Sequence, residues 1–262
     1  MLTVGVDLAA EPKGTAFAMI NWGSAEARLE RLELDVTDQT IVAASSAAEK
    51  IGIDCAFGWP DEFVKFLSTH ANRSGDVDFE PVDGGMEWRR RLAYRETDRR
   101  VREATGRWPL SVATDRLGLT ALRCAGLLDR LQRGGFAVDR AGSGAVVEVY
   151  PGATLRGWGI DTRGYKTEAA PRATLLRIVQ ESAPWLHLGV FERTMVHSAD
   201  AFDAVISAIA ARAAALGMYV HPEPELLDQA QREGWIALPN VPLHELDPSP
   251  PPTARTPNEE PS

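Results

Sequence analysis

An acidic residue inside an apolar run is the feature that most constrains how this chain can fold. The opening segment, MLTVGVDLAA, has the composition of a buried strand except for Asp7. A charge in such a place costs folding free energy unless it has a partner. The pattern recurs in KIGIDCAFGWP, where a short β-branched run ends in Asp54, and again in residues 145–150, which contain Glu148. Three predicted strands therefore carry a carboxylate at or near their ends.

The predicted strands and helices follow one another in the order of an α/β fold. Residues 3–8 and 15–22 are apolar runs separated by a turn with Pro12 and Gly14, which predicts a hairpin. Residues 27–36 predict a third strand, and the alanine-rich segment 42–50 predicts a helix. The strands with Asp54 and Glu148 follow as the fourth and fifth. We expect a mixed five-stranded sheet, flanked by helices, in which the first, fourth and fifth strands lie parallel and adjacent.

The rest of the chain is predicted to be mainly helical. Segment 61–140 is predicted to be an insertion with helices: a polar loop over 72–85, one arginine-rich helix over 86–107, and one or two helices over 114–131. Residues 167–195 also have helical character, with a break at Pro184. The last predicted helix, 198–217, ends at a glycine. We expect one domain over residues 1–238 and a Pro-rich, disordered tail over 239–262.

Composition narrows the class of protein. Every long apolar run is broken by a charge, and the first residues carry no basic segment, so we expect neither a membrane span nor a signal peptide. Two cysteines without metal-ligand spacing fit a reducing, cytoplasmic location. The net charge of −9 argues against a protein that coats nucleic acid non-specifically. It leaves a local basic groove open.

The predicted carboxylates favour a divalent metal site. The carboxyl ends of parallel strands meet at one edge of a sheet, where ligands bind, so Asp7, Asp54 and Glu148 are expected to lie near one another. In the helix 198–217, Asp203 lies beside the apolar stripe, and Asp200 is one turn away on the same side. Clustered carboxylates raise one another's pKa unless a cation neutralises them. Without nearby His or Cys, the natural cations are Mg²⁺ and Mn²⁺.

Five sequence motifs carry a resemblance to a known group of proteins. They are GVDLAA, IDCAFGWP, YRETDRRVR, EVYPGATLRGWG and HSADAFDA, spread over most of residues 3–216. As a set they resemble an uncharacterised family described as predicted RNase H-like nucleases. The resemblance implies an RNase H-like sheet, Mg²⁺ or Mn²⁺, and metal-dependent cleavage of nucleic acid. It matches the expected catalytic acids to Asp7, Asp54, Asp200 and Asp203; Glu148 has no counterpart there and is added as a metal ligand from the residue pattern alone.

Each of these residues also has a simpler structural interpretation. Asp7 and Asp54 could cap turns at strand ends, and Asp200 and Asp203 could complement the helix dipole. Glu148 could be a buried glutamate paired with an arginine. The arginine-rich segment includes Arg95 and Arg99, which are the preferred substrate-binding candidates because they belong to the family-like motif. Acids are interleaved with these arginines, so a solvated helix face with ion pairs is the alternative.

Three functions are compatible with the sequence. The leading hypothesis is an enzyme, a Mg²⁺- or Mn²⁺-dependent nuclease in which Asp7 bridges two metal ions while Asp54 and Asp203 complete their shells. The second is an ATP-binding relative of phosphotransferases, since sugar kinases and actin-like ATPases share this kind of sheet. The third is a catalytically inactive binding or scaffold protein. DNA, RNA and small nucleotides all remain possible substrates, no membrane partner is expected, and the sequence is silent on oligomeric state.

Overall fold

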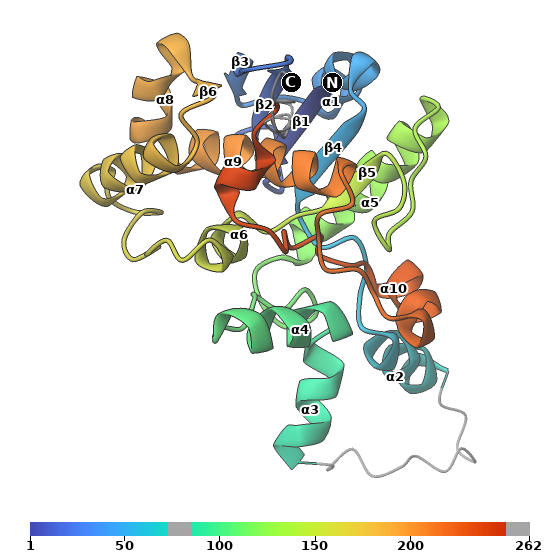
Figure 1. Ribbon diagram of the computed structural model, residues 1–262. Helices are drawn as coiled ribbons and strands as arrows, with labels where there is room; N and C mark the ends of the chain where they lie inside the picture. Colours follow the sequence, from blue (N-terminus) through green and yellow to red (C-terminus); the bar gives the residue numbers. More distant parts are fainter. Residues whose placement is uncertain (73–84, 250–262) are drawn as a thin grey trace, which may run out of the picture.

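The computed structural model describes residues 1–72 and 85–249, and its centre is one mixed β-sheet (Figure 1). The strand order is β5-β4-β1-β2-β3-β6. The antiparallel pairs are β1–β2 and β2–β3, and the parallel pairs are β1–β4, β4–β5 and β3–β6. The strand bounds are β1 Leu2–Asp7, β2 Ala16–Trp22, β3 Ala27–Leu34, β4 Lys50–Asp54, β5 Val146–Glu148 and β6 Leu186–His187. The predicted hairpin and the parallel trio β1, β4 and β5 are confirmed.

The sheet has six strands where the sequence predicts five. The extra strand, β6, lies within the segment 167–195, for which the sequence predicts only helix with a break at Pro184. It consists of Leu186 and His187, paired with Ala27 and Arg28 of β3. Two residues are too few to give an alternating pattern, because the period-2 signal needs several residues. The mixed α/β fold remains compatible with an RNase H-like arrangement.

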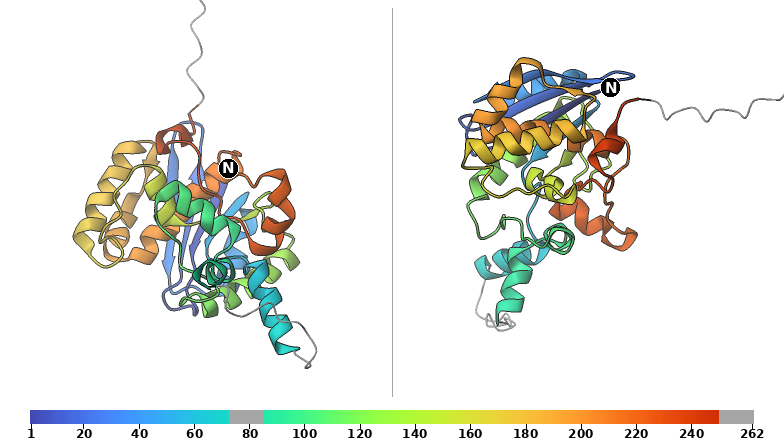
Figure 2. Two further views of the ribbon diagram at one scale, coloured as in Figure 1. Left: turned by 90° about the horizontal axis from the view of Figure 1, so that it is seen from below. Right: turned by 60° about the vertical axis from the view of Figure 1, so that its left-hand side comes forward.

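Helices cover both faces of the sheet, as the views in Figure 2 show. One face packs against α1 (Asp38–Ala44) and α5 (Gly118–Arg133). The other packs against α9 (Ala199–Ala215), with α6 (Pro151–Gly157), α7 (Ala169–Ser182) and α8 (Glu192–His197) around it. The first helix begins and ends earlier than the predicted 42–50, because Thr37 caps its first turn and Lys50 already belongs to β4.

Strand alternation decides which residues face which helix layer. In β1, Val4 and Val6 enter the core on the side of α1 and α5. Thr3 and Gly5 therefore face α9, as the hydrogen bond from Thr3 Oγ1 to the carbonyl oxygen of Ala208 confirms at 2.9 Å. Asp7 continues this series and points to the side of α9. The same alternation places Gly52 and Asp54 of β4 on the α9 side, opposite Ile51 and Ile53.

Helix α9 lies unusually close to the sheet because two strands offer glycine beneath it. A Cβ at Gly5 would lie 2.0 Å from the carbonyl oxygen of Ala204, and one at Gly52 would lie 2.6 Å from that of Ser207. Only a residue without Cβ allows this approach. Alanines fill most of the buried positions of α9, so the helix backbone packs directly on β1 and β4. This contact fixes where the first turns of α9 lie relative to the strand ends.

A helical insertion lies beyond the carboxyl edge of β1, β4 and β5, below the sheet in Figure 1. It comprises α2 (Asp61–Ala71), α3 (Gly85–Ala93) and α4 (Glu96–Thr105), with α10 (Leu227–Glu233) beside α2. The sequence predicts one continuous helix over 86–107, whereas the structure breaks it at Tyr94 and Arg95. The break arises because Arg95 adopts an extended backbone and caps α4, its own N–H donating to Asp98. Most of the predicted loop 72–85 lies outside the described residues.

Glu233 ties the insertion to the C-terminal part of the chain. Its buried carboxylate accepts hydrogen bonds from the backbone N–H of Asp61 (2.8 Å) and of Glu96 (2.9 Å), one oxygen for each. These two residues begin α2 and α4, so one side chain satisfies unpaired amide groups of two helices. The negative charge also lies at the positive end of both helix dipoles. Two helices thus share a single cap.

The predicted tail from residue 239 begins too early. Leu243 and Leu246, in a short 3₁₀ segment, are buried in the core beside α9, and the indole N–H of Trp158 donates to the carbonyl oxygen of Val241. The proline content of this segment predicts a disordered tail, but two leucines three residues apart pack its first part against the core. The remainder of the predicted tail, 250–262, lies outside the described residues.

Among the helices that the structure describes, none combines the length and apolar character that a membrane crossing requires.

Candidate metal centre

Three carboxylates from distant segments converge at the carboxyl edge of the sheet. Asp7 and Asp54 end the adjacent parallel strands β1 and β4 and are direct partners in the register. Both lie on the α9 side of the sheet by strand alternation. Asp203 comes from the second turn of α9, one residue before the Ala204 carbonyl that rests on Gly5. One oxygen of each carboxylate lies within 4.8 Å of the other two. The predicted proximity of Asp7, Asp54 and Asp203 is confirmed.

Asp7 and Asp54, two members of the triad Asp7–Asp54–Asp203, line a cleft of about 290 Å³. Asp203 is fully buried, while Asp7 and Asp54 keep some exposed surface. The wall on the sheet side includes Cys55, Val149 and Tyr150, and the opposite wall is largely apolar, with Pro109, Leu110 and Leu117. The residues of the opposite wall follow α4 in the chain, so the insertion closes one side of the cleft. A small ligand entering here meets Asp7 and Asp54 at the sheet end, with Asp203 buried beside them.

Burial and mutual repulsion change the proton affinity of the triad. Burial raises the pKa of Asp7 well above its ordinary value, and the charges of Asp54 and Asp203 raise it further. Burial also raises the pKa of Asp54 to about 7, opposed mainly by the positive charge of Lys166. The pKa of Asp203 is raised overall, because burial raises it by more than the charge of Lys166 lowers it. The site therefore favours a proton or a cation over three free negative charges.

A lysine that the sequence reasoning missed is part of this site. The ammonium of Lys166, in the loop between α6 and α7, forms an ion pair with Asp203 Oδ2. The hydroxyl of the neighbouring Tyr165 donates to Asp203 Oδ1 at 3.1 Å. The loop has no periodic pattern that would mark it. Composition offers one signal, because only four of the 28 basic residues are lysines, and each stands out in an arginine-rich chain.

Asp200 lies near the triad but does not belong to it. It is half-buried in the first turn of α9, and its oxygens are not among those that lie within 4.8 Å of one another. Its charge contributes to the raised pKa of both Asp7 and Asp203, which places it in the electrostatic surroundings of the site. Its predicted catalytic role stays a prediction.

Glu148, predicted as a metal ligand, has a different partner. Its carboxylate accepts two hydrogen bonds from the Arg95 guanidinium, at 2.7 and 2.8 Å, and a third from the backbone N–H of Phe57 at 2.9 Å. In the register, Glu148 stands opposite Ile53 rather than Asp54, so its side chain leaves the sheet on the face away from α9. Glu148 is thus a buried glutamate paired with an arginine, as the alternative interpretation expects; it also lines the cleft, and its predicted role as a metal ligand stays a prediction.

Arg95, predicted to bind substrate, is the arginine of that pair. Its side chain is only 3% exposed, and it also donates to both oxygens of Asp98. All its donors have protein partners, because it sits between the end of β5 and the start of α4. Arg95 thus joins the insertion to the sheet; it also lines the cleft, and its predicted substrate contact stays a prediction.

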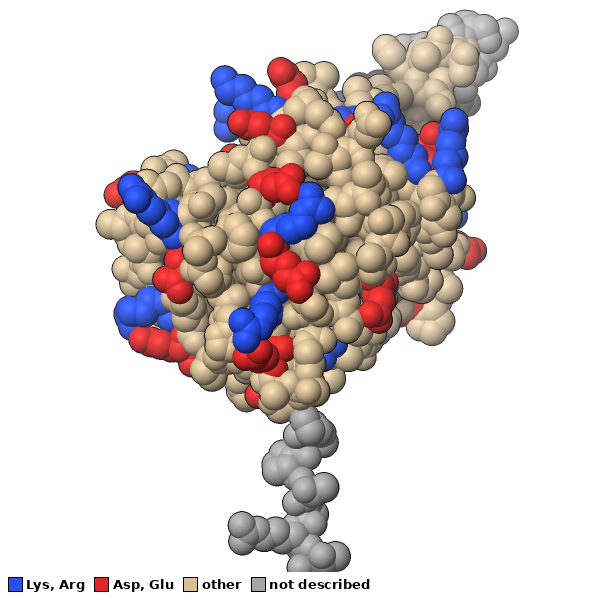
Figure 3. Space-filling model, turned by 90° about the horizontal axis from the view of Figure 1, so that it is seen from above, with Lys and Arg blue, Asp and Glu red and all other residues tan. Residues whose placement is uncertain are grey.

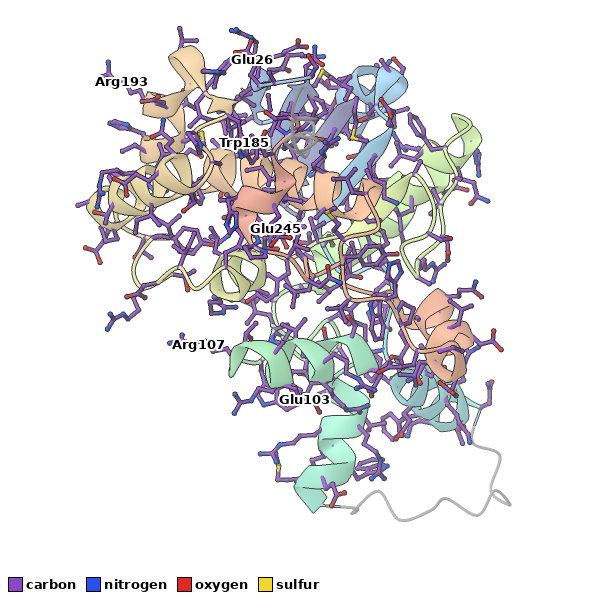
Figure 4. The ribbon with its side chains drawn as sticks, viewed as in Figure 1. Glu26, Glu103, Arg107, Trp185, Arg193 and Glu245 are labelled. Atoms are coloured by element: carbon purple, nitrogen blue, oxygen red, sulfur yellow. The ribbon has the colours of Figure 1, made fainter. Side chains whose placement is uncertain are left out.

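Most of the neighbouring arginines form ion pairs on the surface. Arg99, the other predicted substrate-binding residue, is about one third exposed and pairs with Glu96. Arg100 pairs with Glu96 and Glu223, and Arg91 pairs with Glu62. Glu103 and Arg107 lie on the outside of the insertion (Figure 4). These contacts favour the solvated helix face over a phosphate-binding strip, and the substrate contact by Arg99 stays a prediction.

The face at the other end of the sheet also has mixed charge. Basic and acidic side chains are interspersed over it (Figure 3). No broad surface of positive charge is visible on that face. Nucleic-acid backbones bind to clusters of Lys and Arg. This end of the molecule is therefore a poor candidate for binding nucleic acid, and the cleft at the opposite edge of the sheet stays the candidate site.

Comparison with known proteins gives one match. Residues 5–226 match a family described as a protein of unknown function, DUF429. The chain belongs to this family. The matched region contains the whole triad, Lys166 and Arg95, but ends before Glu233 and the docked leucines. No curated protein and no solved structure matches the chain.

Proposed function

We propose that this member of the DUF429 family is a divalent-metal-dependent phosphodiester hydrolase with an RNase H-like arrangement, acting on nucleic acid or a nucleotide. The observation that carries the proposal is the convergence of Asp7, Asp54 and Asp203 at one edge of the sheet, beside a cleft that Asp7 and Asp54 line. They come from two parallel strand ends and the last long helix, and strand alternation directs the two strand residues toward that helix. The resemblance noted in the sequence expects acids at these three places.

The donor set fits Mg²⁺ or Mn²⁺. All three donors are carboxylate oxygens, and hard divalent cations prefer oxygen ligands. Three carboxylates in a largely buried place are costly without a cation, as the raised pKa values of Asp7 and Asp54 reflect. Asp203 already attracts the ammonium of Lys166, so the site already selects positive charge. A resident metal would replace repulsion among the carboxylates by attraction to a shared centre.

The chain's own residues would hold and position the reactants. Asp7, Asp54 and Asp203 would hold the metal, which when bound supplies Lewis-acid activation of water and stabilisation of the leaving oxygen. Tyr165 fixes the orientation of Asp203 through its hydroxyl. The apolar wall around Leu110 and Leu117 narrows the cleft and excludes bulk water from one side. A phosphodiester entering the cleft would be oriented by these walls against the triad.

The test is Asp7→Asn, which keeps the shape of the side chain but removes its charge. Isothermal titration with Mn²⁺ should show binding by the wild type and loss of at least about tenfold in affinity for the variant, equivalent to about 1.4 kcal/mol. Hydrolysis of single-stranded and duplex DNA and RNA in Mn²⁺ should be lost in parallel. Asp129→Asn, on the exposed face of α5 and paired only with Arg133, is the matched control. Wild-type cleavage by Asp7→Asn would refute the assignment.

The same titration separates the alternative functions. A scaffold protein should show no Mn²⁺ binding that depends on Asp7. An ATP-binding relative should be stabilised by ATP in a thermal shift assay and should fail to cleave phosphodiesters. Neither alternative has a structural observation in its favour comparable to the triad, so they enter as outcomes of the test.

A further inference from the structure

Lys166 occupies the triad in a way that leaves its side chain free to move. Its backbone lies in a turn in which the N–H groups of Thr167 and Glu168 donate to the carbonyl oxygen of Gly164. The buried guanidinium of Arg172 donates to the carbonyl oxygen of Tyr165, which anchors the turn further. The Lys166 side chain, in contrast, is 50% exposed and enters the cleft from the solvent side. Its ammonium can therefore leave the triad without any change in the backbone.

A metal ion and the Lys166 ammonium would compete for the same carboxylate oxygen. Lys166 binds Asp203 Oδ2, while Oδ1 accepts the Tyr165 hydroxyl. Two cations cannot share one buried oxygen without strong repulsion, because Coulomb energies at such distances are large where water is scarce. Ammonium is also a compact point charge on a flexible stem, unlike the planar guanidinium that the chain uses elsewhere. A lysine side chain is therefore suited to a position that it must leave when a metal ion binds.

A second cation, Arg156, lies against a residue of the cleft wall and has no acidic partner among the described residues. Arg156 donates to the hydroxyls of Tyr150 and Thr162, each at 3.3 Å, and its guanidinium stacks over the Tyr150 ring. Among residues 1–72 and 85–249, no carboxylate oxygen lies within 4 Å of it. Tyr150 lines the cleft, so Arg156 stands directly behind the wall. Lys166 in the cleft and Arg156 behind Tyr150 thus supply positive charge suited to an anionic group.

We propose that Lys166 is the resident counter-cation of the metal-free triad, and that divalent-metal binding transfers its ammonium from Asp203 to a phosphate of the substrate. The first half concerns metal binding alone. The second half rests on the proposed phosphodiester hydrolysis. Lys166 would then be a phosphate-binding residue of the loaded site and a competitor of the metal in the empty one.

The decisive experiment compares Mn²⁺ affinity in the wild type, Lys166→Met and Arg163→Met. Methionine keeps the length of the lysine side chain and removes its charge. Arg163 lies in the same loop and is exposed, and among the described residues its ion-pair partner is Asp161, so its substitution makes the same change in net charge without touching the triad. Titration at about pH 8 limits competition from protons on the carboxylates. Thermal melts in EDTA check that each variant is folded.

Removing a competing cation should strengthen metal binding. We expect the dissociation constant of Lys166→Met for Mn²⁺ to fall by about tenfold, the ratio that corresponds to 1.4 kcal/mol, and that of Arg163→Met to change less than about twofold. Unchanged or weaker binding by Lys166→Met would overturn the first half. If that variant does not fold, a crystal structure of the wild type with Mn²⁺ decides instead: Lys166 Nζ still bonded to Asp203 would overturn it.

The second half is tested by hydrolysis of bis(p-nitrophenyl) phosphate at saturating Mn²⁺. Lys166→Met should raise KM by about tenfold or more while its metal affinity is improved, and Lys166→Arg should recover part of the loss because it restores a phosphate-binding cation. An unchanged KM would overturn the transfer to phosphate. If the wild type hydrolyses no phosphodiester at all, the proposed function and this second half both fail, whereas the metal-affinity result still decides the first half.

Discussion

Replacing Gly5 by alanine should disable the proposed metal centre without changing any of its three carboxylates. The new Cβ would lie 2.0 Å from the carbonyl oxygen of Ala204 and 2.3 Å from the amide nitrogen of Ala208. Ordinary contact begins at 3.4 Å, so α9 would have to retreat by about 1.4 Å (3.4 minus 2.0). The obstacle is helix backbone, which no side-chain rotation can move aside. Asp203 directly precedes Ala204 and would be carried with it.

Two magnitudes follow from this displacement. Overpacking a core costs about 1–3 kcal/mol and occasionally more, and a backbone obstacle favours the upper end, so we expect the free energy of unfolding to fall by about 3 kcal/mol. For a domain of this size that corresponds to a decrease in Tm of about 6–12 °C. Metal–oxygen distances are held to within about 0.2 Å, so moving one ligand by several times that amount should weaken Mn²⁺ binding by at least about tenfold.

The assay is thermal unfolding together with Mn²⁺ titration of the folded variant below its Tm. Gly126→Ala is the matched control, because Gly126 lies on the exposed face of α5 with no atom within 4 Å of the added Cβ. That substitution should raise stability by about 0.5–1 kcal/mol through helix propensity. A Gly5→Ala protein with the Tm and metal affinity of the wild type would refute the reasoning that backbone contact positions Asp203.

Two further predictions concern buried charge. Arg95→Met should lower the free energy of unfolding by about 3–5 kcal/mol, because Asp98 and Glu148 are left buried without their partner. Arg99→Met, the control, should change it by less than about 0.5 kcal/mol. Urea unfolding measures both values, and equal losses for the two variants would contradict the prediction. Burial raises the pKa of Asp54 from 3.8 to about 7. Between these two pH values the folded protein holds a proton that the unfolded chain releases. The free energy of unfolding of the metal-free protein should therefore fall as the pH rises from 3.8 to about 7. Mn²⁺ affinity should rise over the same window, and a titration series without pH dependence would show that Asp54 is no ligand.

The sequence was most informative where two periodic patterns agreed. Asp7 and Asp54 each follow a short β-branched run, and parallel strands bring such ends to one edge. Asp203 could be placed because the helical period sets it beside an apolar stripe. These three positions follow from local pattern and one rule of sheet topology. Glu148 could not be placed in the same way, since β5 is apolar on both faces and its alternation gives no direction.

What the sequence could not give depends on contacts between distant loops. Lys166 reaches Asp203 from a loop without periodicity, held by turn hydrogen bonds and by Arg172. At the break before α4, the Arg95 guanidinium pairs with Glu148, 53 residues further along the chain. Each of these is a single polar contact across a large sequence separation, and neither helix nor strand periodicity contains information about it.

The shared cap by Glu233 also has a consequence for the order in which the protein is made. Helices α2 and α4 are synthesised early, yet the carboxylate that satisfies their first amide groups belongs to a residue 172 positions after Asp61. Until Glu233 is synthesised, the first amide groups of both helices lack this acceptor, although Arg95 can already pair with Glu148. The central strands can pair long before then. We therefore expect the capping of α2 and α4 to be completed late in biosynthesis, when the chain beyond residue 233 has left the ribosome.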